Sequence, residues 1–131
     1  MKIAIIGYGG MGNNHRKYII PRLNECLSTG GAAAVLVKPQ FEAGRDKIGK
    51  NGVVRDKKTH IEVLTNAIEH VRSNGFSVHG LEFSPITGPK GNIEFLLYLG
   101  HEENAAECGM GETELTEAVE KTVSDAHMTL K

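Results

Sequence analysis

Two stretches of the chain, residues 37–45 and 84–95, each join an apolar run to a loop dense in glycine, proline and charge. In open α/β sheets, ligand and catalytic groups lie where strands meet loops of this kind. Lys38 stands at the first junction and Glu94 at the second. The sequence therefore predicts an α/β domain with a candidate site at one edge of its sheet.

Apolar runs and helical periodicity predict the order of the elements. We expect strands over 2–6, 32–37, 76–83 and 93–99, and helices over 13–27 and 57–74. This order favours parallel strands joined by right-handed crossovers, a final antiparallel hairpin strand, and helices on both faces of the sheet. Because the final strand runs antiparallel, its first residue, Glu94, is expected at the same edge as Lys38.

Signals at the ends of the second helix support this assignment. Asp56 is a good N-cap for a helix that begins at residue 57. Gly75 stands where a left-handed residue commonly ends a helix. Between them, apolar residues recur at helical spacing, namely Ile61, Leu64, Ile68 and Val71.

Charge is distributed unevenly along the 131 residues, although the formal net charge is only −1. Residues 38–58 hold seven basic and three acidic side chains, whereas residues 101–131 hold eight acidic side chains and two lysines. The basic segment is either a phosphate-binding loop or a solvated loop. We expect residues 1–100 to form one domain, and residues 101–131 to form a loosely attached acidic tail with a surface helix over 112–126.

Several classes of protein are disfavoured by composition. Cys26 and Cys108 form no disulfide framework, and the histidines have no metal-ligand spacing, so no metal site is predicted. The apolar run Ile3–Ile6 is too short for a signal sequence or a membrane span. These features predict a cytoplasmic protein without a membrane partner.

A glycine turn, Gly7-x-Gly9-x-x-Gly12, follows the first predicted strand and precedes a helix. Such a turn lets the backbone approach a pyrophosphate, so these three glycines are candidate cofactor-binding residues. Residues 1–16 resemble the start of NAD(P)-dependent oxidoreductases of the glucose–fructose oxidoreductase type. The next strand, however, is followed by Lys38 rather than by an acidic residue for the ribose. An NAD(P)-binding oxidoreductase fragment is therefore the alternative interpretation.

Longer motifs lie downstream, over 36–45, 49–56 and 84–95. They read Leu-Val-Lys-Pro-Gln-Phe-Glu-Ala-Gly-Arg, Gly-Lys-Asn-Gly-Val-Val-Arg-Asp and Ser-Pro-Ile-Thr-Gly-Pro-Lys-Gly-Asn-Ile-Glu-Phe. With them, residues 18–100 resemble the C-terminal part of the haemolysin-like (TlyA) family of ribosomal RNA 2′-O-methyltransferases, which have an FtsJ-like catalytic domain. The resemblance implies a partial Rossmann-like methyltransferase sheet, S-adenosylmethionine as cofactor and ribosomal RNA as partner.

The resemblance also implies roles for individual residues. Lys38 and Glu94 match two members of the family's Lys-Asp-Lys-Glu catalytic set. Gly7 stands where the aspartate is expected and the first lysine has no counterpart, so the site of this chain is expected to be incomplete. Four basic residues of the neighbouring loop are candidate RNA contacts, namely Arg45, Lys47, Lys50 and Arg55.

Two further expectations follow from the partial sheet. Its first strand would form an exposed edge, which favours a homo-oligomer. A module that binds RNA without catalysis remains a third interpretation, based on the basic segment 38–58.

Overall fold

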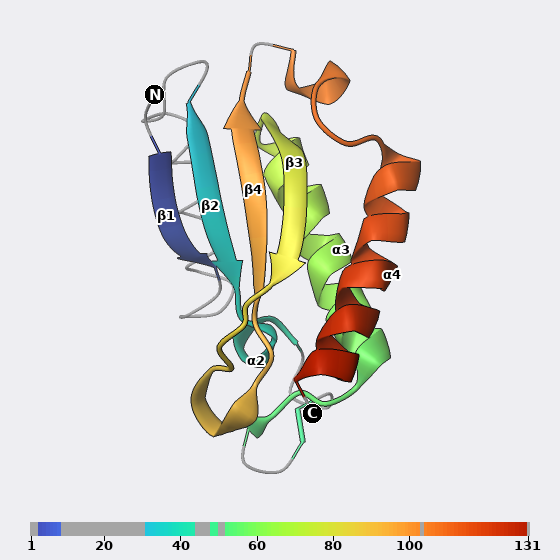
Figure 1. The fold of residues 1–131 in the computed structure, drawn as a ribbon. Helices are drawn as coiled ribbons and strands as arrows, with labels where there is room; N and C mark the ends of the chain where they lie inside the picture. Colours follow the sequence, from blue (N-terminus) through green and yellow to red (C-terminus); the bar gives the residue numbers. More distant parts are fainter. Residues whose placement is uncertain (1–2, 9–30, 44–47, 50–51, 103, 131) are drawn as a thin grey trace.

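A computed structural model describes residues 3–8, 31–43, 48–49, 52–102 and 104–130. Within these residues the chain forms a four-stranded sheet with helices packed against it (Figure 1). The strands are β1 Ile3–Tyr8, β2 Ala32–Val37, β3 Phe76–Phe83 and β4 Phe95–His101. The α-helices are α2 Pro39–Glu42, α3 Lys57–Ser73 and α4 Glu112–Thr129, and two short 3-10 turns are η3 Pro89–Gly91 and η4 Ala105–Glu107. The predicted α/β class is confirmed.

The strands follow the spatial order β1-β2-β4-β3. β1 pairs in parallel with β2, whereas β4 runs antiparallel to both of its neighbours, β2 and β3. The last strand is antiparallel, as predicted, and it lies inside the described sheet, between β2 and β3. Antiparallel pairing therefore predominates among the described ladders, which corrects the expected mainly parallel sheet. The inner position suits β4, because its side chains Phe95, Leu97 and Leu99 are all buried.

Helix α3 begins and ends at the residues that the sequence signals predict. The Asp56 side chain caps it by accepting a hydrogen bond from the Lys58 backbone N–H at 3.3 Å. Gly75 has φ +89°, the left-handed conformation that ends a helix at little cost only in glycine. Of the predicted apolar stripe, Leu64, Ile68 and Val71 are buried and Ile61 is partly buried.

Helix α4 corrects the expectation of a loosely attached acidic tail. Its apolar side chains Leu115, Val119, Val123 and Ala126 are buried, and they belong to the same core as the sheet and α3. The acidic residues occupy the outer side of the helix, so a high overall charge is compatible with a buried apolar stripe. Residues 112–129 therefore form an integral layer of the described fold.

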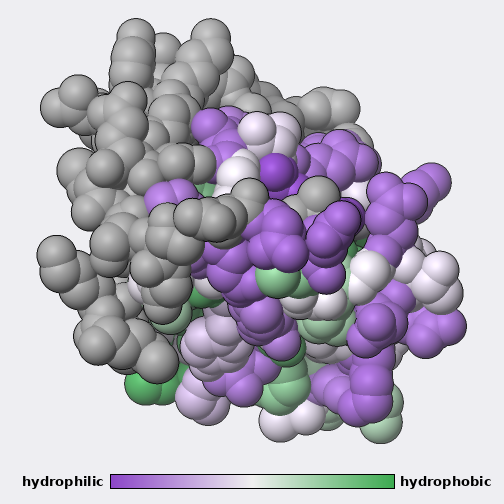
Figure 2. Space-filling view, turned by 90° about the horizontal axis from the view of Figure 1, so that it is seen from above, coloured by the Kyte–Doolittle hydropathy of each residue, from purple (hydrophilic) through white to green (hydrophobic). Residues whose placement is uncertain are grey.

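Helices α3 and α4 cover one face of the sheet (Figure 1). Alternate residues of β2, namely Ala33, Val35 and Val37, are buried in one cluster with side chains of both helices. The helix predicted over 13–27, which would cover the opposite face, lies outside the described residues. Figure 2 shows a mostly hydrophilic surface over the described residues seen from above, with small separate hydrophobic patches. β1 and β3 are the two outer strands of the described sheet, and the homo-oligomer expected through β1 stays a prediction.

A histidine pair, of which His60 is buried and His127 partly buried, joins α3 to α4. His60 is fully buried, its Nδ1 lies 2.7 Å from Nε2 of His127, and its ring stands edge-on to Phe95 at 5.5 Å between centroids. Burial, followed by the nearby His127, lowers the pKa of His60 from 6.5 to about 4. The folded chain therefore holds this histidine neutral under conditions where the unfolded chain binds a proton.

This lowered pKa makes the fold sensitive to acid. Because the folded-state pKa lies below the unfolded value, the stability that His60 contributes is complete above pH 6.5 and is lost as the pH falls towards 4. We expect a loss of up to about 3 kcal/mol in the free energy of unfolding across this window. Urea unfolding at pH 7.5, 6, 5 and 4.5 measures it. His60→Phe, which retains a ring beside Phe95, should show a smaller slope, and equal slopes for both proteins would contradict the prediction.

Candidate active site

Lys38 and Glu94 lie at the same edge of the sheet. The β2–β4 ladder ends with Val37 opposite Phe95. Lys38 follows β2 and Glu94 precedes β4, so the two residues lie across from each other just beyond the ladder. The convergence of these two residues, predicted from the direction of the strands, is confirmed. Lys38 is also the N-cap residue of α2, and Pro39 occupies the first turn of that helix, where its missing N–H costs nothing.

The Glu94 carboxylate is buried and held in place. Its side chain is only 7% exposed, and its Oε2 accepts a hydrogen bond from the Gln40 side-chain amide at 3.1 Å. Its backbone carbonyl accepts a hydrogen bond from the Ser84 N–H at 2.8 Å. The sequence motif contained Gln40 but gave no reason to single it out, because its contact with Glu94 spans 54 positions.

Gly88 lets the loop over 84–92 pass directly beside this carboxylate. A Cβ atom built on Gly88 would lie 2.2 Å from Oε2 of Glu94, well inside any allowed contact. The Gly88 N–H donates to the Asn92 carbonyl at 2.7 Å, which holds the loop in this position. Only glycine fits here without moving the carboxylate, so the glycine of the Thr-Gly-Pro motif has a steric role at the candidate site.

The ammonium of Lys38 lies at the more open side of the edge. Lys38 is partly buried, and its Nζ is 5.9 Å from the ring centroid of Phe41, which is itself 47% exposed. A cation above an aromatic face is stabilised by the ring quadrupole. The edge thus presents a reachable ammonium on the β2 side and a buried carboxylate on the β4 side.

Asn92 ties two of the sequence motifs together. Its side-chain Oδ1 accepts from the Val54 N–H at 2.9 Å, and its Nδ2 donates to the Gly52 carbonyl at 3.1 Å. Asn92 is 2% exposed, so these bonds replace water for its polar atoms. The contacts fix the segment that carries Arg55 against the loop that precedes Glu94. Sequence reasoning missed this role, because the two motifs lie about 40 positions apart.

The structure describes two of the other predicted site residues, Arg55 and Gly7. Arg55 is exposed and lies at the rim of a hollow described below. Gly7 lies within β1, opposite Leu36, so the first strand runs on to Tyr8 and does not end at this glycine as predicted. The remaining candidates lie outside the described residues, namely Gly9, Gly12, Arg45, Lys47 and Lys50.

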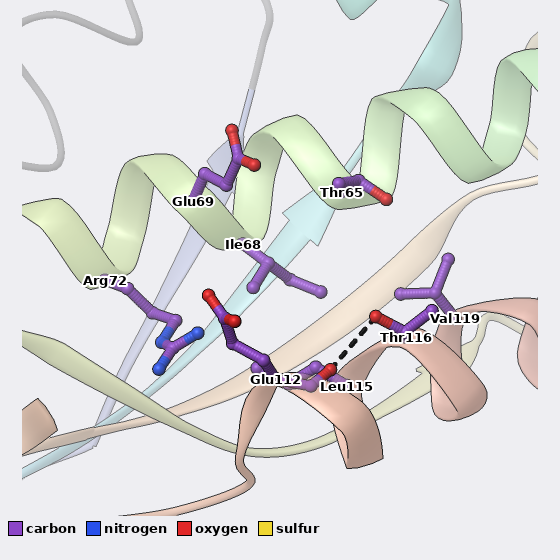
Figure 3. A pocket seen from close by; sticks show the side chains of 8 residues that line it. All are labelled: Thr65, Ile68, Glu69, Arg72, Glu112, Leu115, Thr116 and Val119. Carbon is purple, nitrogen blue, oxygen red and sulfur yellow. Dashed lines mark hydrogen bonds between the residues drawn. The ribbon is translucent and has the colours of Figure 1, made fainter. Parts of the chain in front are cut away.

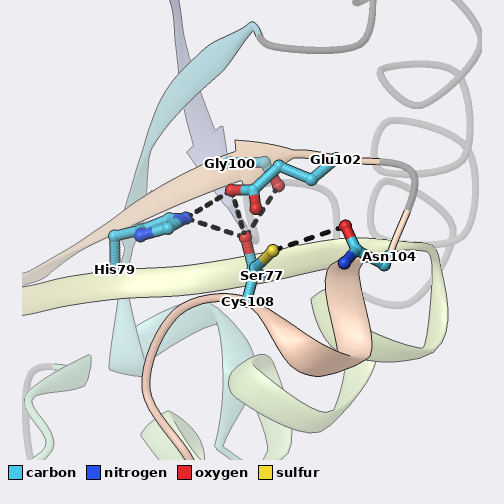
Figure 4. A network of polar contacts seen from close by, with 6 residues as sticks. All are labelled: Ser77, His79, Gly100, Glu102, Asn104 and Cys108. Atoms are coloured by element: carbon cyan, nitrogen blue, oxygen red, sulfur yellow. Dashed lines mark hydrogen bonds and ion pairs between the residues drawn. The ribbon is translucent and has the colours of Figure 1, made fainter.

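A second polar cluster lies at the opposite end of β3 and β4 (Figure 4). Ser77 Oγ and Glu102 Oε1 both contact Nε2 of His79, at 2.9 Å and 2.6 Å. A hydrolytic triad needs the acid on the second ring nitrogen, so that the first can take the serine proton. The cluster therefore lacks this relay. Hydrogen bonding to Cys108 and then to His79 lowers the pKa of Glu102, which keeps its carboxylate charged.

A shallow hollow of about 260 Å³ lies between α3 and α4 (Figure 3). Charged side chains of both signs meet apolar ones in it, including Glu69, Arg72, Glu112 and Leu115. Its lining residues belong to α3 and α4 and include neither Lys38 nor Glu94. In the described parts of the chain, no three His, Cys, Asp or Glu residues are grouped to hold a metal ion, and no helix is long and apolar enough to cross a membrane.

Comparison with solved structures places the fold. A structure from Streptococcus thermophilus, titled as a candidate hemolysin, superposes with a TM-score of 0.82 at 38% identity and covers 98% of this chain and 43% of the other. A candidate hemolysin from Lactococcus lactis gives a TM-score of 0.67 at 40% identity, over 79% of this chain and 48% of the other. The arrangement of elements is thus shared with larger proteins.

Curated relatives agree with the motifs. YqxC of Bacillus subtilis, a candidate rRNA methyltransferase, is 45% identical over 88% of this chain and 40% of its own length. The 16S/23S rRNA (cytidine-2'-O)-methyltransferase TlyA of Mycobacterium tuberculosis is 32% identical over 82% of this chain and 39% of its own length. The chain therefore spans about two fifths of the length of these relatives. The model of the FtsJ-like methyltransferase family matches residues 12–101, more than half of the sequence, and the chain belongs to that family.

Proposed function

We propose that the chain contributes to methyl transfer from S-adenosylmethionine to a ribose 2′-hydroxyl of ribosomal RNA. The observation that carries this proposal is the meeting of Lys38 and Glu94 at the end of the β2–β4 ladder. Family membership and the names of the relatives support the donor and the acceptor. An RNA substrate of this kind belongs to the cytoplasm.

The reaction forms a bond between the ribose oxygen and the methyl carbon and breaks the bond between that carbon and the sulfonium sulfur. The hydroxyl proton must leave as the new bond forms, since the hydroxyl itself is a weak nucleophile. In this proposal, Lys38 either accepts that proton as a neutral amine or remains charged and stabilises the developing alkoxide. Glu94, which is buried and bonded to Gln40, would orient the ammonium when the substrate is bound.

The cofactor would be held mainly by residues other than the two at this edge. Gly7, Gly9 and Gly12 are the contacts proposed for the alternative dinucleotide cofactor, and Gly7 lies within β1. S-adenosylmethionine supplies the methyl group when it is bound. The alternative nicotinamide cofactor gains no support from the relatives, which are named as rRNA methyltransferases or hemolysins.

The test is a transfer assay with S-adenosylmethionine labelled in its methyl group and with ribosomal RNA as acceptor. We expect label in the RNA, at a position that becomes resistant to alkaline cleavage because its 2′-hydroxyl is blocked. Calorimetry with S-adenosylhomocysteine, NAD and NADP, side by side, identifies the cofactor class. Absence of both label and S-adenosylhomocysteine binding would overturn the proposal for this chain, and tight NADP binding would favour the oxidoreductase alternative.

A further inference from the structure

A second hollow, of about 290 Å³, lies close to the proposed active site. Its walls come from the segment over 53–55, the turn η3, the first turn of α3 and the end of α4. Ile93, the residue before Glu94, forms part of the wall. The carboxyl end of α4 and the segment before α3 lie together at the same end of the molecule as α2 (Figure 1). The hollow is therefore on the side of the sheet edge that carries Lys38.

The charge of this hollow is positive. Arg55 and Lys90 are exposed cations on its rim, and no Asp or Glu is among the residues that line it. Asp56, the N-cap residue of α3, caps the helix: its Oδ2 accepts from Thr59 Oγ1 at 3.0 Å and its Oδ1 from the Lys58 N–H. Burial lowers the pKa of both histidines; the Asp56 carboxylate acts in the opposite direction on both, whereas Lys57 helps to lower the pKa of His127. Among the described residues that line the hollow, an anion would meet two cations and no carboxylate.

A histidine pair forms the floor of the hollow. His60 and His127 both line it, and they share one hydrogen bond between Nδ1 of His60 and Nε2 of His127. The other nitrogen of His60, Nε2, is buried on the side of the Val54 backbone. Because only one proton occupies the shared bond, the neutral pair carries a second ring N–H, on Nδ1 of His127 or on Nε2 of His60.

Two cations at the rim of a small hollow, with imidazole rings at its floor, are groups that recognise a phosphate. We propose that this hollow binds a phosphodiester of the RNA, next to the nucleotide whose ribose lies at the Lys38–Glu94 edge. The inference rests on the proposed function, because an RNA strand that reaches Lys38 must place a neighbouring phosphate along the same edge. Arg55 was predicted from the sequence as an RNA contact; Lys90, His60 and His127 are additions from the structure.

The experiment measures RNA binding by the full chain as a function of salt. A fluorescein-labelled ribosomal RNA oligonucleotide is titrated by anisotropy with wild type, Arg55→Ala, Lys90→Ala and the double variant. Each single variant should bind about fivefold more weakly at low salt and reduce the slope of log affinity against log salt by about one. Lys121→Ala is the matched control, because Lys121 lies on the exposed side of α4 and pairs with Asp125 at 3.0 Å. Circular dichroism confirms that all variants remain folded.

The outcomes separate this inference from the proposed function. A double variant with the affinity and salt slope of wild type overturns the phosphate site, and so does a wild-type chain that binds no RNA. Methyl transfer and S-adenosylhomocysteine binding are measured independently, and they decide the proposed function alone. Inorganic phosphate and tripolyphosphate form a further arm. Displacement of RNA by either one supports the site, whereas binding of free phosphate that leaves RNA affinity unchanged assigns the hollow to a small anion and overturns the inference.

Discussion

Replacing Lys38 by alanine should lower methyl transfer by about 10²- to 10⁴-fold, the usual contribution of a positioned proton-transfer group. Lys38 stands opposite Glu94 at the end of the β2–β4 ladder, and its partly buried side chain extends beside the exposed ring of Phe41. Truncation removes the ammonium but leaves the strand and α2 intact, so folding should be little affected. The measurement is single-turnover transfer of a labelled methyl group to ribosomal RNA.

Lys38→Arg distinguishes the two roles that remain open for the lysine. Arginine retains the positive charge but cannot give up a proton under physiological conditions. A rate close to wild type would show that charge stabilisation is sufficient, whereas a loss as large as that of the alanine variant would assign proton acceptance to Lys38. Lys121→Ala, an exposed lysine of α4 outside the basic segment, is the matched control. Transfer by Lys38→Ala within about threefold of wild type would contradict any chemical role for this side chain.

Local signals in the sequence predicted much of this fold. The N-cap Asp56, the left-handed Gly75 and the apolar stripe of α3 depend only on neighbours within a few positions, and the structure confirms them. The meeting of Lys38 and Glu94 was also predictable, because strand direction alone fixes which end of a strand lies at which edge. These features need no knowledge of the packing between distant segments.

Features that depend on distant contacts were missed. The insertion of β4 between β2 and β3 is decided by which strands bury the most apolar surface together, and periodicity does not report this. The helix over 112–126 and its apolar spacing were predicted, but its acidic composition suggested a loosely attached tail, whereas Leu115 and Val119 are buried in the core. Gln40 and Asn92 carry ordinary polar side chains whose roles arise only through partners far along the chain. Composition therefore gave the wrong prediction for the packing of α4. The motifs gave no sign that Gln40 and Asn92 hold the candidate site together.

Phe95→Ala should destabilise the chain by about 3–5 kcal/mol, the range for deleting a large buried aromatic side chain. Phe95 is completely buried at the first position of β4, opposite Val37 on one side and Phe83 on the other. Its ring also stands edge-on to His60, at an interplanar angle of 66°. Removal would leave a cavity where the sheet, α3 and the histidine pair meet. Urea unfolding at pH 7.5 measures the loss.

Two control variants separate the loss of buried volume from the loss of a ring. Tyr98→Ala truncates a ring on the same strand, but Tyr98 is 38% exposed and its hydroxyl donates to Glu82 at the surface, so we expect about 1 kcal/mol. Phe95→Leu retains most of the buried volume and should cost less than about 1.5 kcal/mol. If Phe95→Ala lowers the free energy of unfolding by less than about 1 kcal/mol, or by no more than Tyr98→Ala, the prediction is contradicted. The place where the sheet, α3 and the histidine pair meet would then tolerate a cavity. Because Glu94 is the preceding residue, such tolerance would also mean that the edge holding Glu94 opposite Lys38 is not fixed by the packing of β4.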